Sequence, residues 1–277
     1  MKISVFYEHI VEASVQTGKS VSEICRLVAS YGIRGVEIED KRLFGENYIV
    51  KEKILTDLKE ADMEISCIYG FYDFSHEDKI QRAYDLIDTA YDLGIKKIMP
   101  IPGFIQENEA EIYKECLDKM IYAMNQICSY AKEKKIMVVL EDFDDKIAHF
   151  SNAKGLKYFM DQVPDLYCTF DTGNFLYSEE DSLEVLPMFL DKIGHVHCKD
   201  RSLTEVKGEE FKATIAGRNM FSSPVGSGII KMREIIEKIK ESGYDDYFAI
   251  EHFGSLDQLG FMKKSAEWLN GKEFKKI

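Results

Sequence analysis

Four short apolar runs in the second half of the chain each carry a side chain that can ligate a metal ion. The runs are VVLEDF (138–143), CTFDTGN (168–174), GHVHCKD (194–200) and AIEHFG (249–254), and the side chains are Glu141, Asp171, His197 and Glu251. Three carboxylates buried close together repel one another unless protons or a cation neutralise them. One ligand from each of four strand ends therefore predicts a divalent-cation site of the kind that holds a sugar-like substrate.

The ligand set limits the identity of this cation. Carboxylate oxygens suit Mn²⁺ or Mg²⁺, whereas an imidazole brings Zn²⁺, Co²⁺ and Fe²⁺ into range. We favour one Mn²⁺ ion, with Mg²⁺, Co²⁺ and Zn²⁺ as alternatives.

The ligands need elements that bring them together, and the chain offers eight apolar, β-branched runs that predict strands. These runs cover 3–7, 35–39, 64–69, 97–101, 136–142, 167–171, 195–198 and 247–252. Helical periodicity separates most of them, and strands that alternate with helices favour a parallel sheet. Eight such units in 277 residues predict an α/β fold, a (β/α)8 TIM barrel, as a single domain over residues 1–277.

Side-chain alternation along barrel strands supports this prediction, because it turns the four ligand candidates towards the barrel interior at the strand ends. An open doubly wound sheet is the main competitor, and it usually carries a Gly-rich turn after its first strand. The residues that follow the first run here, YEHIVEAS, contain no glycine.

Two local features refine the expected elements. Ser20 followed by Glu23 predicts a capping box at a helix start. Pro187 is expected to kink or shorten the sixth expected helix, 181–194. The segment 201–228 is longer than an ordinary βα loop, and we expect it to cover the metal site as a lid.

Composition excludes several classes of function. The net charge is −13, and no basic stripe of the kind that binds nucleic acid is present. No apolar run approaches the ~20 residues that span a membrane, and the six cysteines are scattered without a CxxC pair. We therefore expect a cytoplasmic protein with a small-molecule partner, no nucleic acid and no membrane; a homo-oligomer stays open.

The ordered set LED, FDTGN, HVHCKD, PVGSG and IEH resembles the xylose-isomerase-like sugar phosphate isomerase/epimerase superfamily, and the resemblance extends along the whole chain. It implies that Glu141, Asp171, His197 and Glu251 bind one divalent cation. It also implies that Glu141 and Glu251 are the catalytic acid/base pair. The cation would stabilise a cis-enediolate while one glutamate removes a proton and the other returns it.

This reading predicts an isomerase or epimerase of a sugar, a sugar phosphate or a related polyhydroxy carbonyl compound. A second reading is a lyase on the same scaffold, an inosose or dehydroshikimate dehydratase, in which the enediolate expels a β-hydroxyl. A DNA-repair endonuclease is a remote alternative, because the charge of −13 and only six histidines argue against it. A sugar-binding protein without activity is disfavoured by the complete ligand set.

Four further residues are candidates for substrate binding: Asn174, Lys199, Arg201 and Glu39. Asn174 stands where ketose epimerases often place a histidine, so the sugar is left open. Lys199 and Arg201 follow His197 and either reach substrate oxygens or form loop surface charges. Glu39 ends the second strand in the inward phase. His195, one layer deeper than His197, is expected to support the site rather than to ligate.

Overall fold

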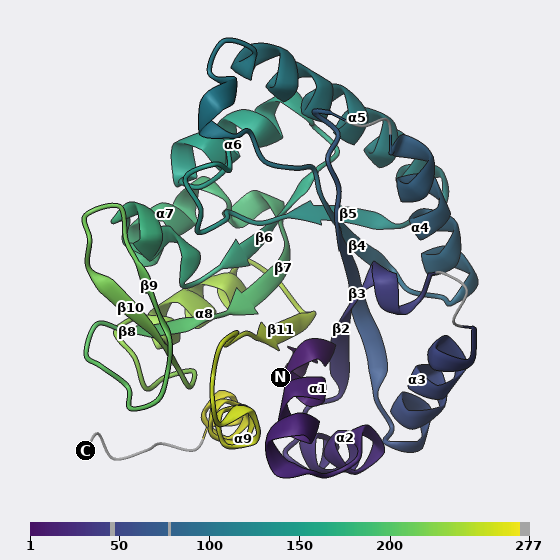
Figure 1. The fold of residues 1–277 in the computed structure, drawn as a ribbon, viewed down its shortest axis with the longest axis vertical. Coiled ribbons are helices and arrows are strands. Elements are labelled where there is room, and N and C mark those ends of the chain that lie inside the picture. The colour runs from purple at the N-terminus through teal and green to yellow at the C-terminus, as the bar shows by residue number, and fades with distance from the viewer. Residues whose placement is uncertain (45–47, 77–78, 272–277) are drawn as a thin grey trace.

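The computed structural model describes residues 1–44, 48–76 and 79–271, and its centre is a closed barrel of eight parallel strands (Figure 1). The barrel strands are β1 (Lys2–Phe6), β2 (Gly35–Glu39), β3 (Glu64–Phe71), β4 (Lys97–Ile101), β5 (Met137–Leu140), β6 (Tyr167–Asp171), β7 (Ile193–Cys198) and β11 (Tyr247–Ile250). Each predicted strand run overlaps one of these. β1 pairs with β11, which closes the ring. The predicted (β/α)8 class is therefore confirmed.

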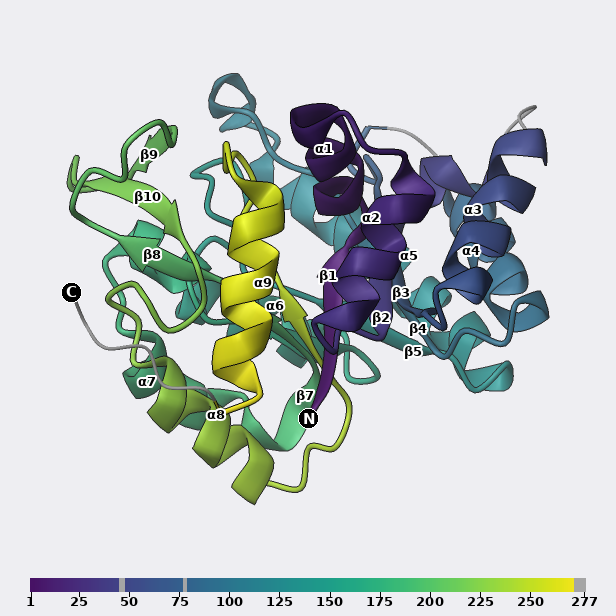
Figure 2. The same ribbon diagram turned by 90° about the horizontal axis from the view of Figure 1, so that it is seen from below.

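Helices surround the barrel on the outside (Figures 1 and 2). They are α1 (Tyr7–Thr17), α2 (Val21–Ser30), α3 (Tyr48–Glu60), α4 (Ile80–Asp92), α5 (Tyr113–Glu133), α6 (Ala153–Gln162), α7 (Ser182–Val185), α8 (Met232–Glu241) and α9 (Gln258–Leu269). Short 3₁₀ turns occupy Asp40–Arg42, Glu107–Glu109, Asn174–Ser178, Leu186–Met188 and Leu190–Lys192. Among the described residues, no helix combines the length and apolar character needed to cross a membrane.

Local sequence signals explain where several helices begin and end. Ser20 and Glu23 form the predicted capping box at the start of α2. After α7 the chain continues as two 3₁₀ turns, and Pro187 lies in the first of them. Proline lacks the N–H that an α-helix interior requires, which explains why α7, the sixth helix expected from the sequence, is short.

The segment after β7 is not a plain loop. It forms a three-stranded antiparallel sheet of β8 (Asp200–Ser202), β10 (Asn219–Ser223) and β9 (Phe211–Ala213), in that order. We call this sheet, residues 200–223, the flap. It lies at the carboxyl end of the barrel strands, the end from which α1 begins (Figure 2). The sequence predicted the position of this segment but not its strands.

Candidate active site

The four predicted ligands meet at one point inside the carboxyl end of the barrel. Each offers one ligand atom, and these atoms lie within 4.8 Å of one another. Asp171 and His197 face each other in the register of β6 and β7, while Glu141 and Glu251 directly follow β5 and β11. All four side chains are buried. Because side chains alternate in direction along each strand, the four side chains meet as the sequence predicted.

The chemistry of this cluster fits a divalent cation. Asp171 Oδ2 and Glu251 Oε2 are buried without a hydrogen-bond partner. The other Asp171 oxygen, Oδ1, accepts the N–H groups of Gly173 and Asn174 at 2.7 and 2.8 Å, which fixes the carboxylate. Burial raises the pKa of Asp171 to about 7 and raises that of Glu141 as well. A bound cation would stabilise both the carboxylate oxygens that make no hydrogen bond and the ionised form of the carboxyls whose pKa burial raises.

Lys199 makes the two candidate catalytic glutamates unequal. Its Nζ donates to Asn174 Oδ1 at 2.6 Å, forms a close ion pair with Glu251 and lies 3.4 Å from Asp171 Oδ2. Burial opposes the charge of Glu251, but the Lys199 ammonium outweighs it and holds the pKa of Glu251 below its usual value. Glu141 has no such ammonium contact, so it is the stronger base of the pair.

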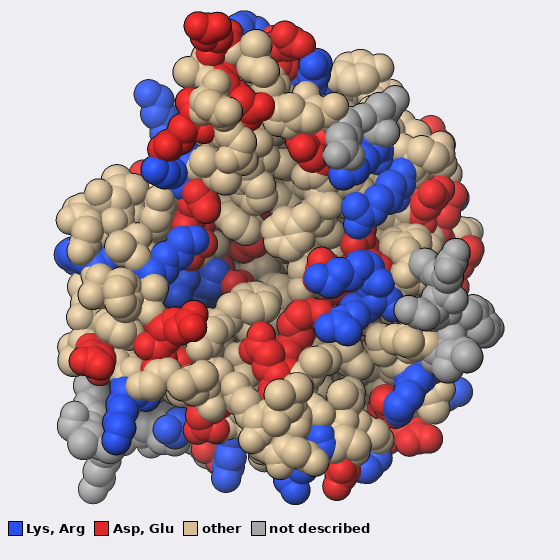
Figure 3. Space-filling view, viewed as in Figure 1, with Lys and Arg blue, Asp and Glu red and all other residues tan. Residues whose placement is uncertain are grey.

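A cavity of about 490 Å³ opens above the cluster. Its apolar lining comes from both halves of the chain, with Phe6, Tyr69 and Phe71 from the first half and Phe143 and Phe253 from the second. Figure 3 shows this face, with a hollow near its middle that acidic and basic side chains border. The second half of the chain supplies all four ligand candidates and the cationic lining. Apolar side chains around a few converging polar groups are typical of a small-molecule site.

The flap contributes to the same cavity, as expected for a lid, through Phe211, Lys212, Met220 and Ser222. Arg201 and Lys212 both donate to the Asp144 carboxylate, at 2.8 and 2.9 Å. Arg201 is buried, and its Nε has no hydrogen-bond partner.

All four predicted substrate-binding residues line the cavity: Asn174, Lys199, Arg201 and Glu39. Glu39 lies on the rim in a close ion pair with Lys41. Asn174 also donates from Nδ2 to the Asp142 carbonyl at 2.8 Å. Their position makes substrate contact a reasonable proposal for each.

Sequence reasoning missed Glu37 and Lys97, both buried inside the barrel. Glu37 contacts the rings of both His195 and His197, at 2.6 and 3.2 Å. The available signal was a charged residue at the centre of an apolar strand, because such residues are seldom fully buried without a partner. Glu37 also shares the inward phase of Glu39, two residues later.

Comparison with known proteins agrees with this geometry. The family model described as "xylose isomerase-like TIM barrel" matches residues 25–272. An inosose dehydratase of Bacillus cereus is 24% identical over 242 residues, which are 81% of this chain and 79% of that protein. An inosose dehydratase of Clostridium perfringens (strain 13 / Type A) is 28% identical over 137 residues, 46% of this chain. The chain spans 44% of the length of that relative.

Solved structures show the same fold. A probable 3-DHS dehydratase of Bacillus anthracis superposes with a TM-score of 0.74 at 19% identity, covering 99% of this chain and 100% of that one. An L-ribulose 3-epimerase superposes with a TM-score of 0.72 at 17% identity, covering 98% and 94%. At these identities the likeness concerns the fold.

Proposed function

Because the chain belongs to the xylose isomerase-like TIM barrel family, we propose that it is a divalent-metal-dependent lyase acting on a polyhydroxy carbonyl compound. In the proposed reaction the enzyme removes a proton next to the carbonyl and then expels a β-hydroxyl as water. The inosose dehydratases and the probable 3-DHS dehydratase among its relatives support this choice. Glu141, Asp171, His197 and Glu251 would hold the cation.

The observation that carries the proposal is the ammonium of Lys199 inside the cavity. A cation in the cluster would chelate two substrate oxygens and stabilise the enediolate. Glu141, the stronger base, would take the proton from the carbon next to the carbonyl. Lys199, already hydrogen-bonded to Asn174 and paired with Glu251, would donate a hydrogen bond to the departing hydroxyl and stabilise its developing negative charge. The proton that Glu141 took would pass to this hydroxyl, which leaves as water. Isomerisation expels no hydroxyl and so requires no such donor.

The second candidate is an isomerase or epimerase, as the sequence first indicated. Glu141 and Glu251 lie on opposite sides of His197 in the strand order, and their oxygens come within 2.8 and 3.1 Å of its Nδ1. Two carboxylates that converge on one point suit proton removal by one and proton return by the other.

Product mass separates the two candidates. Protein reloaded with Mn²⁺ is incubated in D₂O with an inosose, with 3-dehydroshikimate and with a set of ketoses, and products are followed by mass spectrometry and NMR. We expect a product that has lost water. A product that has lost no water and carries deuterium next to the carbonyl would instead establish the isomerase or epimerase. Full turnover in chelator-treated protein would contradict both.

A variant tests the role of Lys199 directly. Lys199→Met should retain exchange of the proton next to the carbonyl while elimination falls by about 100-fold or more, the usual contribution of one hydrogen-bond donor to a developing oxyanion. Lys212→Met is the matched control, because Lys212 lines the same cavity but contacts Asp144. It should change KM without changing the ratio of exchange to elimination. Metal content is measured for both variants, since Lys199 also neighbours Asp171.

A further inference from the structure

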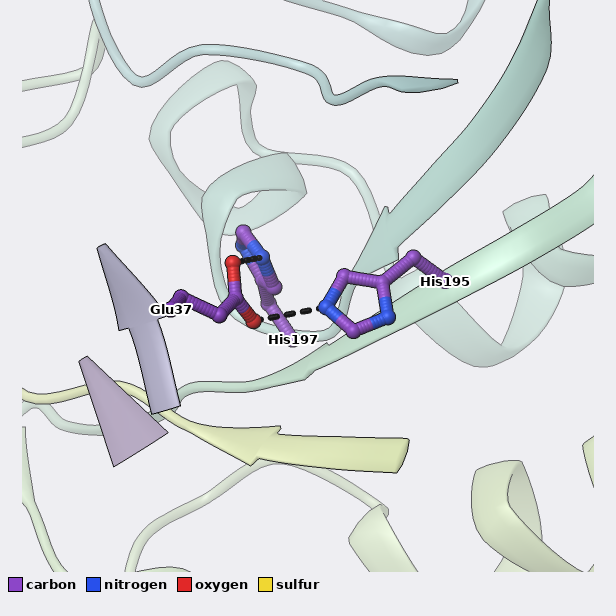
Figure 4. A group of neighbouring side chains, drawn as sticks. All are labelled: Glu37, His195 and His197. Carbon is purple, nitrogen blue, oxygen red and sulfur yellow. Dashed lines mark hydrogen bonds and ion pairs between the residues drawn. The ribbon is translucent and has the colours of Figure 1, made fainter. Parts of the chain in front are cut away.

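A line of hydrogen-bonded polar side chains crosses the barrel interior beneath the candidate metal point. Lys97 Nζ contacts Asp246 Oδ2 at 3.0 Å and His195 Nδ1 at 2.9 Å. His195 Nε2 lies 2.6 Å from Glu37 Oε1, and Glu37 Oε2 lies 3.2 Å from His197 Nε2. Figure 4 shows the carboxylate of Glu37 between the two rings. The line ends at the imidazole whose Nδ1 faces the carboxylate cluster.

This line is costly to build. Lys97, Glu37, His195 and His197 are all buried, at positions that branched aliphatic side chains usually fill in a TIM barrel. Burying charged groups costs several kcal/mol per ion unless geometry and hydrogen bonds offset it. Asp246 is partly exposed, and both it and Lys97 line a cavity at the amino end of the barrel.

The donor and acceptor groups of these side chains fix the direction of each hydrogen bond in the line. A lysine ammonium has only donors, so Lys97 donates to Nδ1 of His195, and the ring of His195 carries its proton on Nε2. That N–H donates to Glu37. A carboxylate has only acceptors, so the second oxygen of Glu37 receives the Nε2–H of His197. The other nitrogen of His197, Nδ1, lies 2.8 Å from Glu141 Oε2 and 3.1 Å from Glu251 Oε2. With the ring proton held on Nε2, the lone pair of Nδ1 would be free to ligate a cation in that cluster.

We propose that Lys97 and Glu37 are positioning residues that fix the ring of His197 so that Nδ1 is presented to the divalent cation. Glu37 holds Nε2 of His197 directly, and Lys97 acts through His195 and Glu37. The proposal rests on the metal dependence proposed above. A carboxylate that holds the second nitrogen of a ligating histidine orients the ring and raises its basicity. Here the orientation is set from the amino end of the barrel, the end opposite the substrate cavity.

The same three residues could be read as a second metal site, since Glu37, His195 and His197 offer ligand atoms within 4.8 Å of one another. Their geometry argues against that reading. The nitrogens that face Glu37 are already at hydrogen-bond distance from its oxygens, and the Lys97 ammonium lies 2.9 Å from the other nitrogen of His195. A divalent cation there would be repelled by Lys97.

Metal affinity tests the proposal without reference to turnover. Apo protein is titrated with Mn²⁺, and free Mn²⁺ is measured by electron paramagnetic resonance. Glu37→Gln should raise the Kd by about 10–100-fold, the range measured when such outer partners are lost. Lys97→Met should raise it by about 10-fold. Ser4→Ala is the matched control, because Ser4 is buried in the barrel and its hydroxyl has no partner. It should leave the Kd unchanged.

A spectroscopic readout separates positioning from simple loss of structure. In ¹⁵N-histidine-labelled protein loaded with Zn²⁺, nitrogen shifts should show the Nε2–H tautomer for His195, and Lys97→Met should mix its tautomers while the circular dichroism spectrum is retained. A Nδ1–H tautomer in the wild type, or a Lys97→Met protein that binds Mn²⁺ as well as wild type, overturns the inference alone. If the wild-type protein binds neither Mn²⁺ nor Zn²⁺, both the proposed function and this inference are overturned.

Discussion

At the scale of single residues, His252 is a buried imidazole beside the candidate active site, and its burial lowers its pKa. It follows Glu251 but faces the helices, stacked on His9 with ring centroids 4.6 Å apart and edge-on to Phe261. Both of its ring nitrogens are buried without a partner. Because burial disfavours the charged ring, the pKa of His252 lies well below its usual value. The unfolded chain therefore takes up this proton more readily than the folded protein.

This difference predicts acid sensitivity. A lowered pKa in the folded state leaves stability intact above the unfolded value of about 6.5 and removes it progressively below, by up to about 1.4 kcal/mol per pH unit. His252→Phe keeps the ring stack and removes the titration, so its stability relative to wild type should rise by about 2 kcal/mol between about pH 7.5 and about pH 5. Urea unfolding at both pH values measures this. An equal difference at both would contradict the argument.

At the scale of elements, the Asp200 carboxylate joins the start of the flap to the segment that follows it. It begins β8, and its carboxylate accepts the N–H groups of Gly226 and Gly228 at 2.9 Å and that of Ile230 at 3.2 Å. A Cβ on Gly228 would lie 2.2 Å from Asp200 Oδ1, so only glycine allows this close approach. The PVGSG sequence is thus the point at which the chain returns from the flap.

Loss of this carboxylate should loosen the flap and spare the cation. Asp200→Ala removes the acceptor of four N–H groups, those of Gly226, Gly228, Ile230 and the neighbouring Arg201. We expect this to cost about 1–3 kcal/mol. Because flap residues line the cavity but none belongs to the ligand cluster, kcat/KM should fall about 10-fold or more with Mn²⁺ affinity unchanged. Asp181→Ala is the control, since the Asp181 carboxylate caps α7 and pairs with Lys231, both outside residues 200–223. An equal loss in both variants would point to general destabilisation.

The sequence could predict local features of the site better than contacts between distant residues. Strand alternation is local, so the inward phase of Asp171 or His197 could be read from a few neighbours. Lys97 reaches His195 across 98 positions, and Glu37 reaches it across 158. No local pattern contains such pairs, because barrel closure creates them. The flap strands were missed for another reason: they are only 3 to 5 residues long and carry no apolar run of their own.

At the scale of the whole molecule, the proposed cation site would couple metal binding to folding. A ligand that binds only the folded state stabilises it by about 2.7 kcal/mol at 100 times its Kd. For a chain of 277 residues this corresponds to a rise in Tm of about 5 °C. Calorimetry of apo protein with and without Mn²⁺ should show this rise. Asp171→Ala should abolish most of it, and an unchanged Tm in wild type would show that no cation binds the folded state.

The two halves of the barrel contribute differently to the candidate site. Glu141, Asp171, His197 and Glu251 all come from the second half, whereas the first half contributes only part of the cavity lining. Recombination between relatives would therefore exchange the first half, and with it that part of the lining, around an unchanged ligand cluster. Glu37 is the exception, because it crosses from β2 to His197. Any chimera would have to inherit a carboxylate at that position for its two parents to share one working centre.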